Sequence, residues 1–128
     1  MKISIQEVEY GRFGPCVCLT NGLCSVWVTV GCGPRVIRFS LEGYENVFAE
    51  LNEEGFETED GFWYIRGGHR LWHSPEAMPR TYTLDTGAVP WAPLENGIRT
   101  MQAPGKDGMG KEMDIVMHST MAIYRYTG

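Results

Sequence analysis

The part of the chain best equipped for chemistry is the segment YIRGGHRLWHSPEAMPRTY, residues 64–82. It holds three arginines, two histidines, a tryptophan and a glutamate, a mixture that a hydrophobic core does not need. Arginine offers a planar fork of donors, and histidine donates, accepts or transfers a proton near neutral pH. Tryptophan supplies a flat apolar face and one N–H donor. Together these groups suit a sugar ring, which carries hydroxyls on its rim and C–H groups on its face.

A pair of glycines, Gly67 and Gly68, directly follows the β-prone run FWYIR. Glycine permits backbone conformations that a β-carbon blocks, and it lets a ligand approach the main chain closely. The arginines of the segment would also suit a phosphate group, because the guanidinium fork matches its oxygens. The residues that we predict to contact a ligand are Arg66, Gly68, Arg70, Trp72, His73 and Arg80.

Most of these residues also have a purely structural interpretation, and the sequence leaves both open. Arg70 can pair with Glu76 to brace an irregular loop, and Glu76 can instead pair with Arg80 or accept from ligand hydroxyls. Trp72 is a large residue of a kind more often found in a core than on a platform. His69 follows a costly double glycine, and local backbone strain gathers at functional sites.

Neither the cysteines nor the acidic stretch predicts a metal site. Cys16, Cys18, Cys24 and Cys32 fall within 17 residues, but no pair has the C-x2-C spacing of a zinc knuckle. In a reducing compartment they are expected to be small apolar strand residues. The stretch ELNEEGFETED, residues 50–60, lacks the spacing of a calcium loop and is interpreted as a solvated loop. We therefore predict no metal and no cofactor.

The segments that must position these residues read as short strands separated by turns. Asn21-Gly22 and Asn96-Gly97 are strong hairpin signals, each flanked by β-prone runs. The only weak helix candidate is YENVFAELNEE, residues 44–54, and VMHST around His118 is expected to be a turn between the last strands, KEMDIVM and MAIYRYT. Some nine to eleven short strands predict an all-β protein, an antiparallel β-sandwich formed by residues 1–128 as a single domain.

Composition and charge exclude several classes of partner. The chain has 128 residues and a net charge of −5, which argues against a nucleic-acid backbone as partner, because that needs clustered Lys and Arg. No apolar run approaches the roughly 20 residues of a membrane helix, so no membrane partner is expected. The N-terminal MKISIQEVEYGRF has no apolar signal-peptide core, and a cytoplasmic location is the default expectation.

Three blocks of the sequence resemble, in order, the N-terminal half of aldose-epimerase-like proteins, the galactose-mutarotase-like superfamily. The first block resembles the opening hairpin and a following G-x-R-I strand. The second carries a Gly-Gly-His-Arg-Leu-Trp and Pro-Glu signature, and the third resembles a Gly-x-x-Lys-Glu strand. The resemblance spans roughly residues 15 to 118, and its blocks are NGLCSVWVTVGCGPRVIRFSLEGYENVF, YIRGGHRLWHSPEAMPRTYTLDTGAVPW and NGIRTMQAPGKDGMGKEMDI.

This resemblance implies a large antiparallel β-sandwich with a concave sugar-binding face. Studied members of the superfamily interconvert the anomers of aldoses, using a glutamate as general base and a histidine as acid. Carried over to this chain, it implies that His69 acts as the acid, Arg70 orients hydroxyls and Trp72 packs on the ring. Glu76 is then the nearby candidate for the base. His69 and Glu76 are thus the predicted catalytic residues.

The resemblance also implies a departure, because members of the superfamily are far longer than this chain. The segment that would carry their base glutamate has no counterpart here. The chain is then expected to be either a truncated or a naturally half-length version of such a protein. We therefore expect a carbohydrate-binding protein, for a small-molecule sugar, with little or no catalysis. The alternatives are an aldose or sugar-phosphate 1-epimerase completed by dimerisation, and a non-binding remnant that acts as an interaction protein. Half a sandwich would expose an apolar face, so a homodimer is expected.

Overall fold

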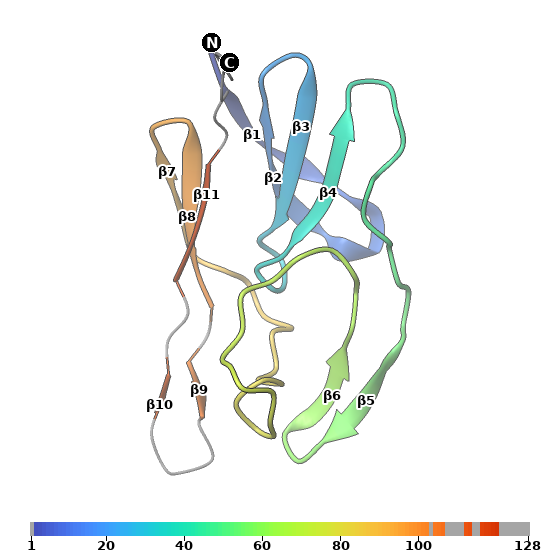
Figure 1. Cartoon of the computed structure of the whole chain (residues 1–128), viewed down its shortest axis with the longest axis vertical. Helices are drawn as coiled ribbons and strands as arrows, with labels where there is room; N and C mark the ends of the chain where they lie inside the picture. The colour runs from blue at the N-terminus through green and yellow to red at the C-terminus, as the bar shows by residue number, and fades with distance from the viewer. Residues whose placement is uncertain (1, 103, 107–111, 114–115, 121–128) are drawn as a thin grey trace, which may run out of the picture.

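The computed structural model describes residues 2–102, 104–106, 112–113 and 116–120 of the chain, with side chains described as far as Gly105. In these residues the regular structure is β, apart from one 3-10 turn, η1 (Gly11–Phe13). Figure 1 shows the strands gathered into four antiparallel groups. The predicted all-β class is confirmed.

The first sheet has four strands in the order of the chain. Its members are β1 (Ser4–Glu9), β2 (Pro15–Thr20), β3 (Cys24–Thr29) and β4 (Val36–Leu41). The predicted hairpin at Asn21-Gly22 joins β2 to β3. The Asn21 side-chain oxygen accepts from the backbone N–H groups of Leu23 and Cys24, and Gly22 takes a left-handed φ of 88°. These are the reasons why Asn-Gly favours a tight turn.

The second sheet has the order β11-β8-β7, with β7 (Trp91–Leu94), β8 (Gly97–Met101) and β11 (Val116–Thr120). The predicted hairpin at Asn96-Gly97 is confirmed, with Asn96 at a φ of 57°. The prediction of a turn at VMHST was wrong, because these residues form β11 and pair with all of β8, His118 opposite Arg99. A partner strand distant in sequence decided this, which local pattern does not reveal.

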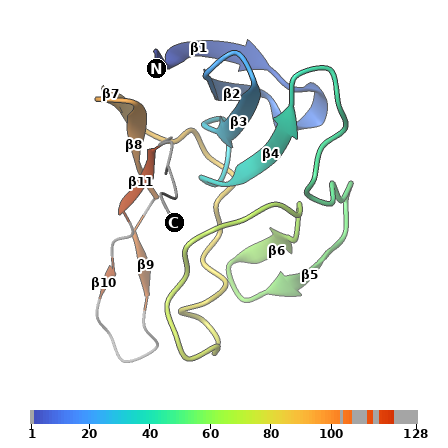
Figure 2. The same cartoon turned by 45° about the horizontal axis from the view of Figure 1, so that its top comes forward.

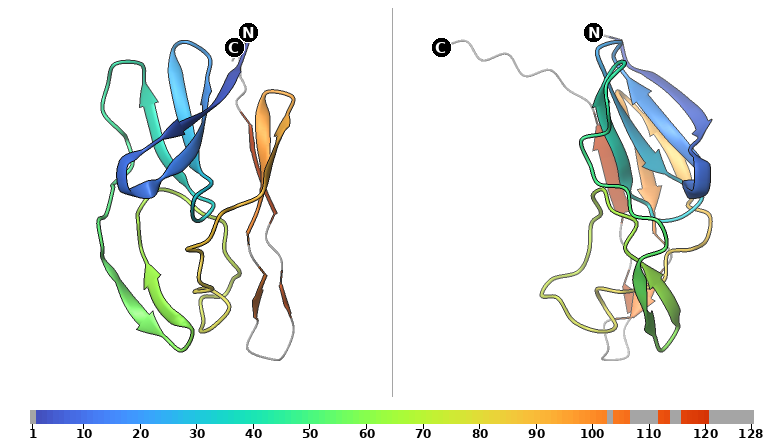
Figure 3. Two further views of the ribbon diagram at one scale, coloured as in Figure 1. Left: turned by 180° about the vertical axis from the view of Figure 1, so that it is seen from behind. Right: turned by 90° about the vertical axis from the view of Figure 1, so that its right-hand side faces the viewer.

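The two sheets pack face to face, and their shared core gives the molecule its sandwich-like architecture (Figure 3). Val17, Leu19 and Val28 from the first sheet meet Ile98 of β8 and Val89, which precedes β7. All five are 6% exposed or less. Complete burial of such side chains stabilises a fold by about 1.5–3 kcal/mol each, so this layer holds the sheets together.

A separate hairpin stands beyond the end of the first sheet. It pairs β5 (Gly55–Thr58) with β6 (Gly61–Tyr64), as Figure 2 shows. The interpretation of residues 50–60 as a loop throughout was therefore wrong, since β5 lies inside it: Phe56 faces Trp63 across the pair. Residues 44–54 form no helix, and a further short hairpin joins β9 (Gly105–Lys106) to β10 (Glu112–Met113). The predicted strand MAIYRYT, 121–127, lies outside the described residues.

Three of the four cysteines are strand residues, as predicted, and Cys32 lies in the turn after β3. Cys16 and Cys18 are buried on β2 and Cys32 is buried beyond β3, while Cys24 is half-buried; all four are free thiols. Burial raises the pKa of Cys16 to about 12. A thiol held in its neutral form is a poor nucleophile and metal ligand.

Within the described part of the chain, no helix is long and apolar enough to cross a membrane.

One edge of the first sheet carries a cluster of exposed apolar side chains. The loop after β4 partly covers this edge, because Val47 N–H donates to the Phe39 carbonyl. Five large apolar residues nevertheless remain 41–73% exposed there, and we call them the β4 patch: Leu23, Phe39, Leu41, Tyr44 and Val47. Apolar patches of this kind mark association surfaces. The homodimer expected from the sequence stays a prediction, and the β4 patch is the surface that would serve it.

If two copies associate through the β4 patch, the double variant Leu41→Glu/Val47→Glu will weaken the dimer. Two charges buried in an interface without partners should raise the dissociation constant at least tenfold, about 1.4 kcal/mol. Analytical ultracentrifugation across a concentration series measures this. Met78→Glu, at another exposed apolar residue, is the matched control. A wild-type protein that stays monomeric at all concentrations would contradict the prediction.

Candidate functional site

A buried carboxylate lies at the centre of the site. Asp85 is 7% exposed and accepts from two arginines, Arg35 through Oδ2 at 3.5 Å and Arg66 through Oδ1. Both arginines are themselves buried, at 3% and 8% exposed. Burial lowers the pKa of Arg35 to about 10, while the Asp85 charge opposes that shift. Charges this deep need such pairing, because they have lost the stabilisation of water.

The same cluster ties three distant segments together. The Arg35 guanidinium also donates to the carbonyls of Tyr64, at 3.3 Å, and Gly67, at 3.4 Å. The Asp85 carbonyl accepts from Gly33 N–H at 2.8 Å. The turn after β3, the end of β6 and the segment before β7 are therefore fixed relative to one another. This fixes Arg66, which itself takes an uncommon left-handed backbone with φ 58°.

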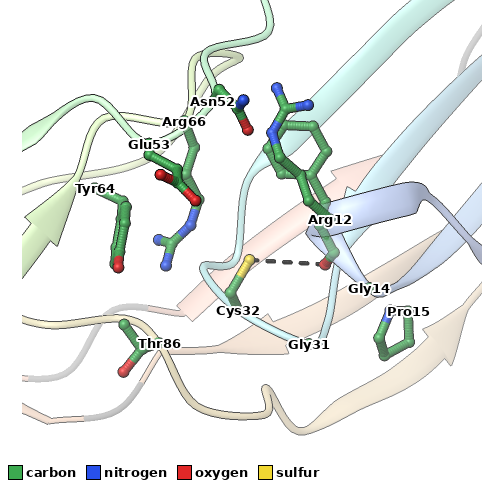
Figure 4. Close-up of a pocket in the computed structure, with 11 residues that line it drawn as sticks. Arg12, Gly14, Pro15, Gly31, Cys32, Asn52, Glu53, Tyr64, Arg66 and Thr86 are labelled. Carbon is green, nitrogen blue, oxygen red and sulfur yellow. Dashed lines mark hydrogen bonds between the residues drawn. The ribbon is translucent and has the colours of Figure 1, made fainter.

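A cleft of about 460 Å³ opens beside Arg66 (Figure 4). Its volume lies within the range of pockets that hold small ligands, ~300–1,000 Å³. Phe13 and the turn after β3 form one side. The polar groups come from four segments: Arg12, Asn52 with Glu53, Tyr64 with Arg66, and Thr86.

The polar lining combines donors, acceptors and groups that do both. Arg12 stacks over the Phe13 ring at 4.5 Å and donates to the Leu51 carbonyl at 3.0 Å, so its exposed guanidinium is held in place. The Arg66 guanidinium lies 5.2 Å from the Tyr64 ring centre. Glu53 supplies an exposed carboxylate acceptor. An arrangement like this can bind a small polyol, whose hydroxyls both donate and accept.

The double glycine serves the packing of the chain itself. A β-carbon on Gly68 would lie 2.3 Å from the Val36 carbonyl oxygen, and one on Gly67 would lie 2.1 Å from that of Ala49. The backbone of His69 then bridges to Val36 with two hydrogen bonds of 2.8 and 2.9 Å. The close approach that we predicted for a ligand is taken by the protein's own backbone.

Arg70 belongs to an aromatic cluster. Its guanidinium lies 4.8 Å from the Trp63 ring, 5.9 Å from Tyr82 and 6.0 Å from Trp72, and it donates to the Thr81 carbonyl at 2.8 Å. Burial lowers the pKa of Arg70. Cation–π contacts of this kind contribute about 0.5–2 kcal/mol each. Arg70 therefore holds the loop over β6.

The structure gives neither ion pair suggested for Glu76. Its carboxylate accepts from the Tyr82 hydroxyl, and the Arg80 Nε donates to the Pro75 carbonyl at 2.8 Å. Arg80 therefore braces the loop from within. Backbone carbonyls accept from Arg70 and Arg80 instead, and a phenol donates to Glu76.

The remaining predicted residues do not line the cleft. Trp72 is 45% exposed, so its interpretation as a core residue was wrong. His69 is exposed, and His73 is half-buried with a buried Nε2 that has no hydrogen-bond partner in the described residues. Of all the predicted site residues, Arg66 lines the cleft, and His69 and Glu76 do not.

Sequence reasoning missed most of the cleft. Asn52 and Glu53 lie in the acidic stretch that was interpreted as solvent-facing, and Thr86 and Asp85 lie in a segment without a motif. The one available signal was Arg35, a charged residue placed between the Gly33-Pro34 break and an apolar strand. Among the described residues, no three His, Cys, Asp or Glu side chains gather as metal ligands.

Comparison with known proteins gave no relative on which function could rest. No protein-family model, no curated protein and no solved structure matches this chain. The function must therefore be argued from the site itself.

Gly68→Ala tests whether the loop depends on the missing β-carbon. Gly43 also has a positive φ, 79°, but open space around it, so Gly43→Ala measures the backbone cost alone, about 1–2 kcal/mol. Gly68→Ala adds a clash with Val36 and should cost about 1–3 kcal/mol more. Urea unfolding followed by tryptophan fluorescence gives both values. Equal losses in the two variants would show that the loop accommodates the side chain.

Proposed function

We propose that this chain is a carbohydrate-binding protein whose site is the cleft beside Arg66. The observation that carries the proposal is the polar lining, in which arginine, amide, carboxylate and hydroxyl groups from separate segments converge on one volume of about 460 Å³. A sugar needs both donors and acceptors around its rim, and Tyr64 and Phe13 offer apolar surface for its C–H groups.

The geometry of the cleft depends on groups that do not line it. Asp85 and Arg35 hold Arg66 from behind, and Arg70 clamps the following loop onto Trp63. A site held by buried interactions loses little conformational freedom on binding, which favours affinity. The residues 67–82 are thus assigned mainly a positioning role in this proposal.

Ligand-observed NMR with D-glucose, D-galactose and D-mannose tests the proposal. Asn52→Ala should weaken binding roughly two- to tenfold, the equivalent of one lost hydrogen bond. Asn96→Ala changes an exposed asparagine outside the cleft and should leave sugar binding unchanged. If neither these hexoses nor an acidic derivative such as D-glucuronate or D-glucose 6-phosphate binds, the proposal fails, and the interpretation as a non-binding interaction protein takes its place.

A second candidate, an aldose 1-epimerase, is favoured by one observation: a carboxylate, Glu53, lines the same cleft. As general base, Glu53 would take the proton of the anomeric hydroxyl while the bond from C1 to the ring oxygen breaks. The ring oxygen would receive a proton from the Tyr64 hydroxyl, and the open-chain aldehyde would rotate and close on its other face. Glu53 would thereby take the role predicted for Glu76, which does not line the cleft.

For this candidate, Glu53→Gln should abolish anomer exchange while retaining most of the binding, because the amide still accepts but cannot take a proton. Polarimetry of freshly dissolved α-D-glucose measures exchange against buffer. Glu57→Gln removes an exposed carboxylate on β5, outside the cleft, and serves as the control. If the wild-type protein exchanges anomers no faster than buffer alone, the epimerase candidate fails and the proposed carbohydrate binding stands without catalysis.

A further inference from the structure

The Arg66 guanidinium has more donors than partners. A guanidinium carries five N–H groups. In the described residues, Arg66 makes one side-chain hydrogen bond, from Nη1 to Asp85. Arg66 is 8% exposed, so bulk water reaches little of it, and it lines the cleft. No Arg66 nitrogen is among the buried side-chain atoms that lack a partner in the described residues, so its remaining donors face the cleft, where a ligand oxygen can take the place of water.

The charge around Asp85 is unbalanced as well. Two guanidiniums, those of Arg35 and Arg66, pair with this single carboxylate, while the positive charge of Arg70 is felt by both Asp85 and Glu76. The like charges of Arg70 and Arg66, together with burial, act to lower the pKa of Arg35. The chain as a whole carries −5, so this positive centre stands against the average charge of the protein. The contacts of Arg35 and Arg66 with one carboxylate leave an excess of one positive charge beside the cleft.

Arg12 adds a second guanidinium on the opposite side of the cleft (Figure 4). It comes from η1, a different element, and its hydrogen bond to Leu51 leaves most of its donors free for other acceptors. Glu53 forms no ion pair with either arginine in the described residues. Its charge offsets part of the positive potential of the two arginines, and its oxygens remain acceptors for hydroxyls.

We infer that the ligand of this cleft carries an oxyanion, a carboxylate or a phosphate, which Arg66 and Arg12 bind together. Arginine forks match the paired oxygens of both groups, and such charge-assisted bonds are about twice as strong as neutral ones. The inference rests on the proposed carbohydrate function and narrows it to acidic sugars: uronic acids through the carboxylate, or sugar phosphates through the phosphoryl group.

The test compares four probes by ligand-observed NMR: D-glucose, D-glucuronate, D-glucose 6-phosphate and inorganic phosphate. At least one acidic sugar should bind tenfold or more tightly than glucose, and its advantage should shrink between 50 and 500 mM NaCl because salt screens the exposed Arg12. Comparison of glucuronate with glucose 6-phosphate tells which oxyanion the site prefers.

Arg12→Gln is the main variant, because Arg12 is exposed and its loss should not unfold the protein. It should remove most of the preference for the acidic sugar. Arg99→Gln removes the same charge from an exposed position on β8 outside the cleft and should retain the preference. Arg66→Lys keeps the positive charge opposite Asp85 but loses the planar fork of guanidinium donors, so it should also lower the preference for the acidic sugar.

The outcomes separate this inference from the proposed function. Equal binding of glucose and both acidic sugars overturns the oxyanion site and leaves carbohydrate binding intact. Binding of inorganic phosphate that is lost in Arg12→Gln, with no sugar bound, supports the oxyanion site and overturns the carbohydrate function. An acidic-sugar preference that Arg12→Gln leaves unchanged overturns the assignment to this cleft.

Discussion

The placement of the site depends on the buried carboxylate of Asp85. One side chain accepts from two arginines that are 31 residues apart in sequence, and its own carbonyl accepts from Gly33. Removal of Asp85 would leave two buried guanidiniums without their carboxylate, which costs several kcal/mol. For this reason the turn after β3, the end of β6 and the approach to β7 hold one arrangement. The cleft exists because these three segments meet there.

The chemically rich segment 64–82 owes most of its composition to this arrangement. The double glycine lets the backbone pass directly against Val36 and Ala49. The Arg70 guanidinium makes cation–π contacts with aromatic rings and donates a hydrogen bond to the Thr81 carbonyl. An irregular loop has few backbone partners, so side chains must satisfy its polar groups. Arginine and glutamate are common in such loops for that structural reason as well as for recognition.

The proposed function depends on the side chains that line the cleft beside Arg66. Tyr64 and Arg66 belong both to the segment 64–82 and to the lining of the cleft, and Arg66 is in addition a member of the buried cluster around Asp85. The oxyanion of the proposed ligand would accept hydrogen bonds from guanidinium donors that the single carboxylate of Asp85 leaves without a partner. Asn52 and Glu53, at the mouth, would set which sugar fits.

The sequence by itself determined the all-β class and its two Asn-Gly hairpins, because turn chemistry and alternation act between neighbouring residues. It also predicted Arg66 as a ligand-binding residue, but it did not predict that Arg66 pairs with Asp85. Only the tertiary structure decided that VMHST is a strand, that Trp72 is exposed and that Glu53 faces a cleft. Those outcomes depend on contacts between segments far apart in the chain. No local pattern encodes which distant segment supplies the acceptor for a buried charge.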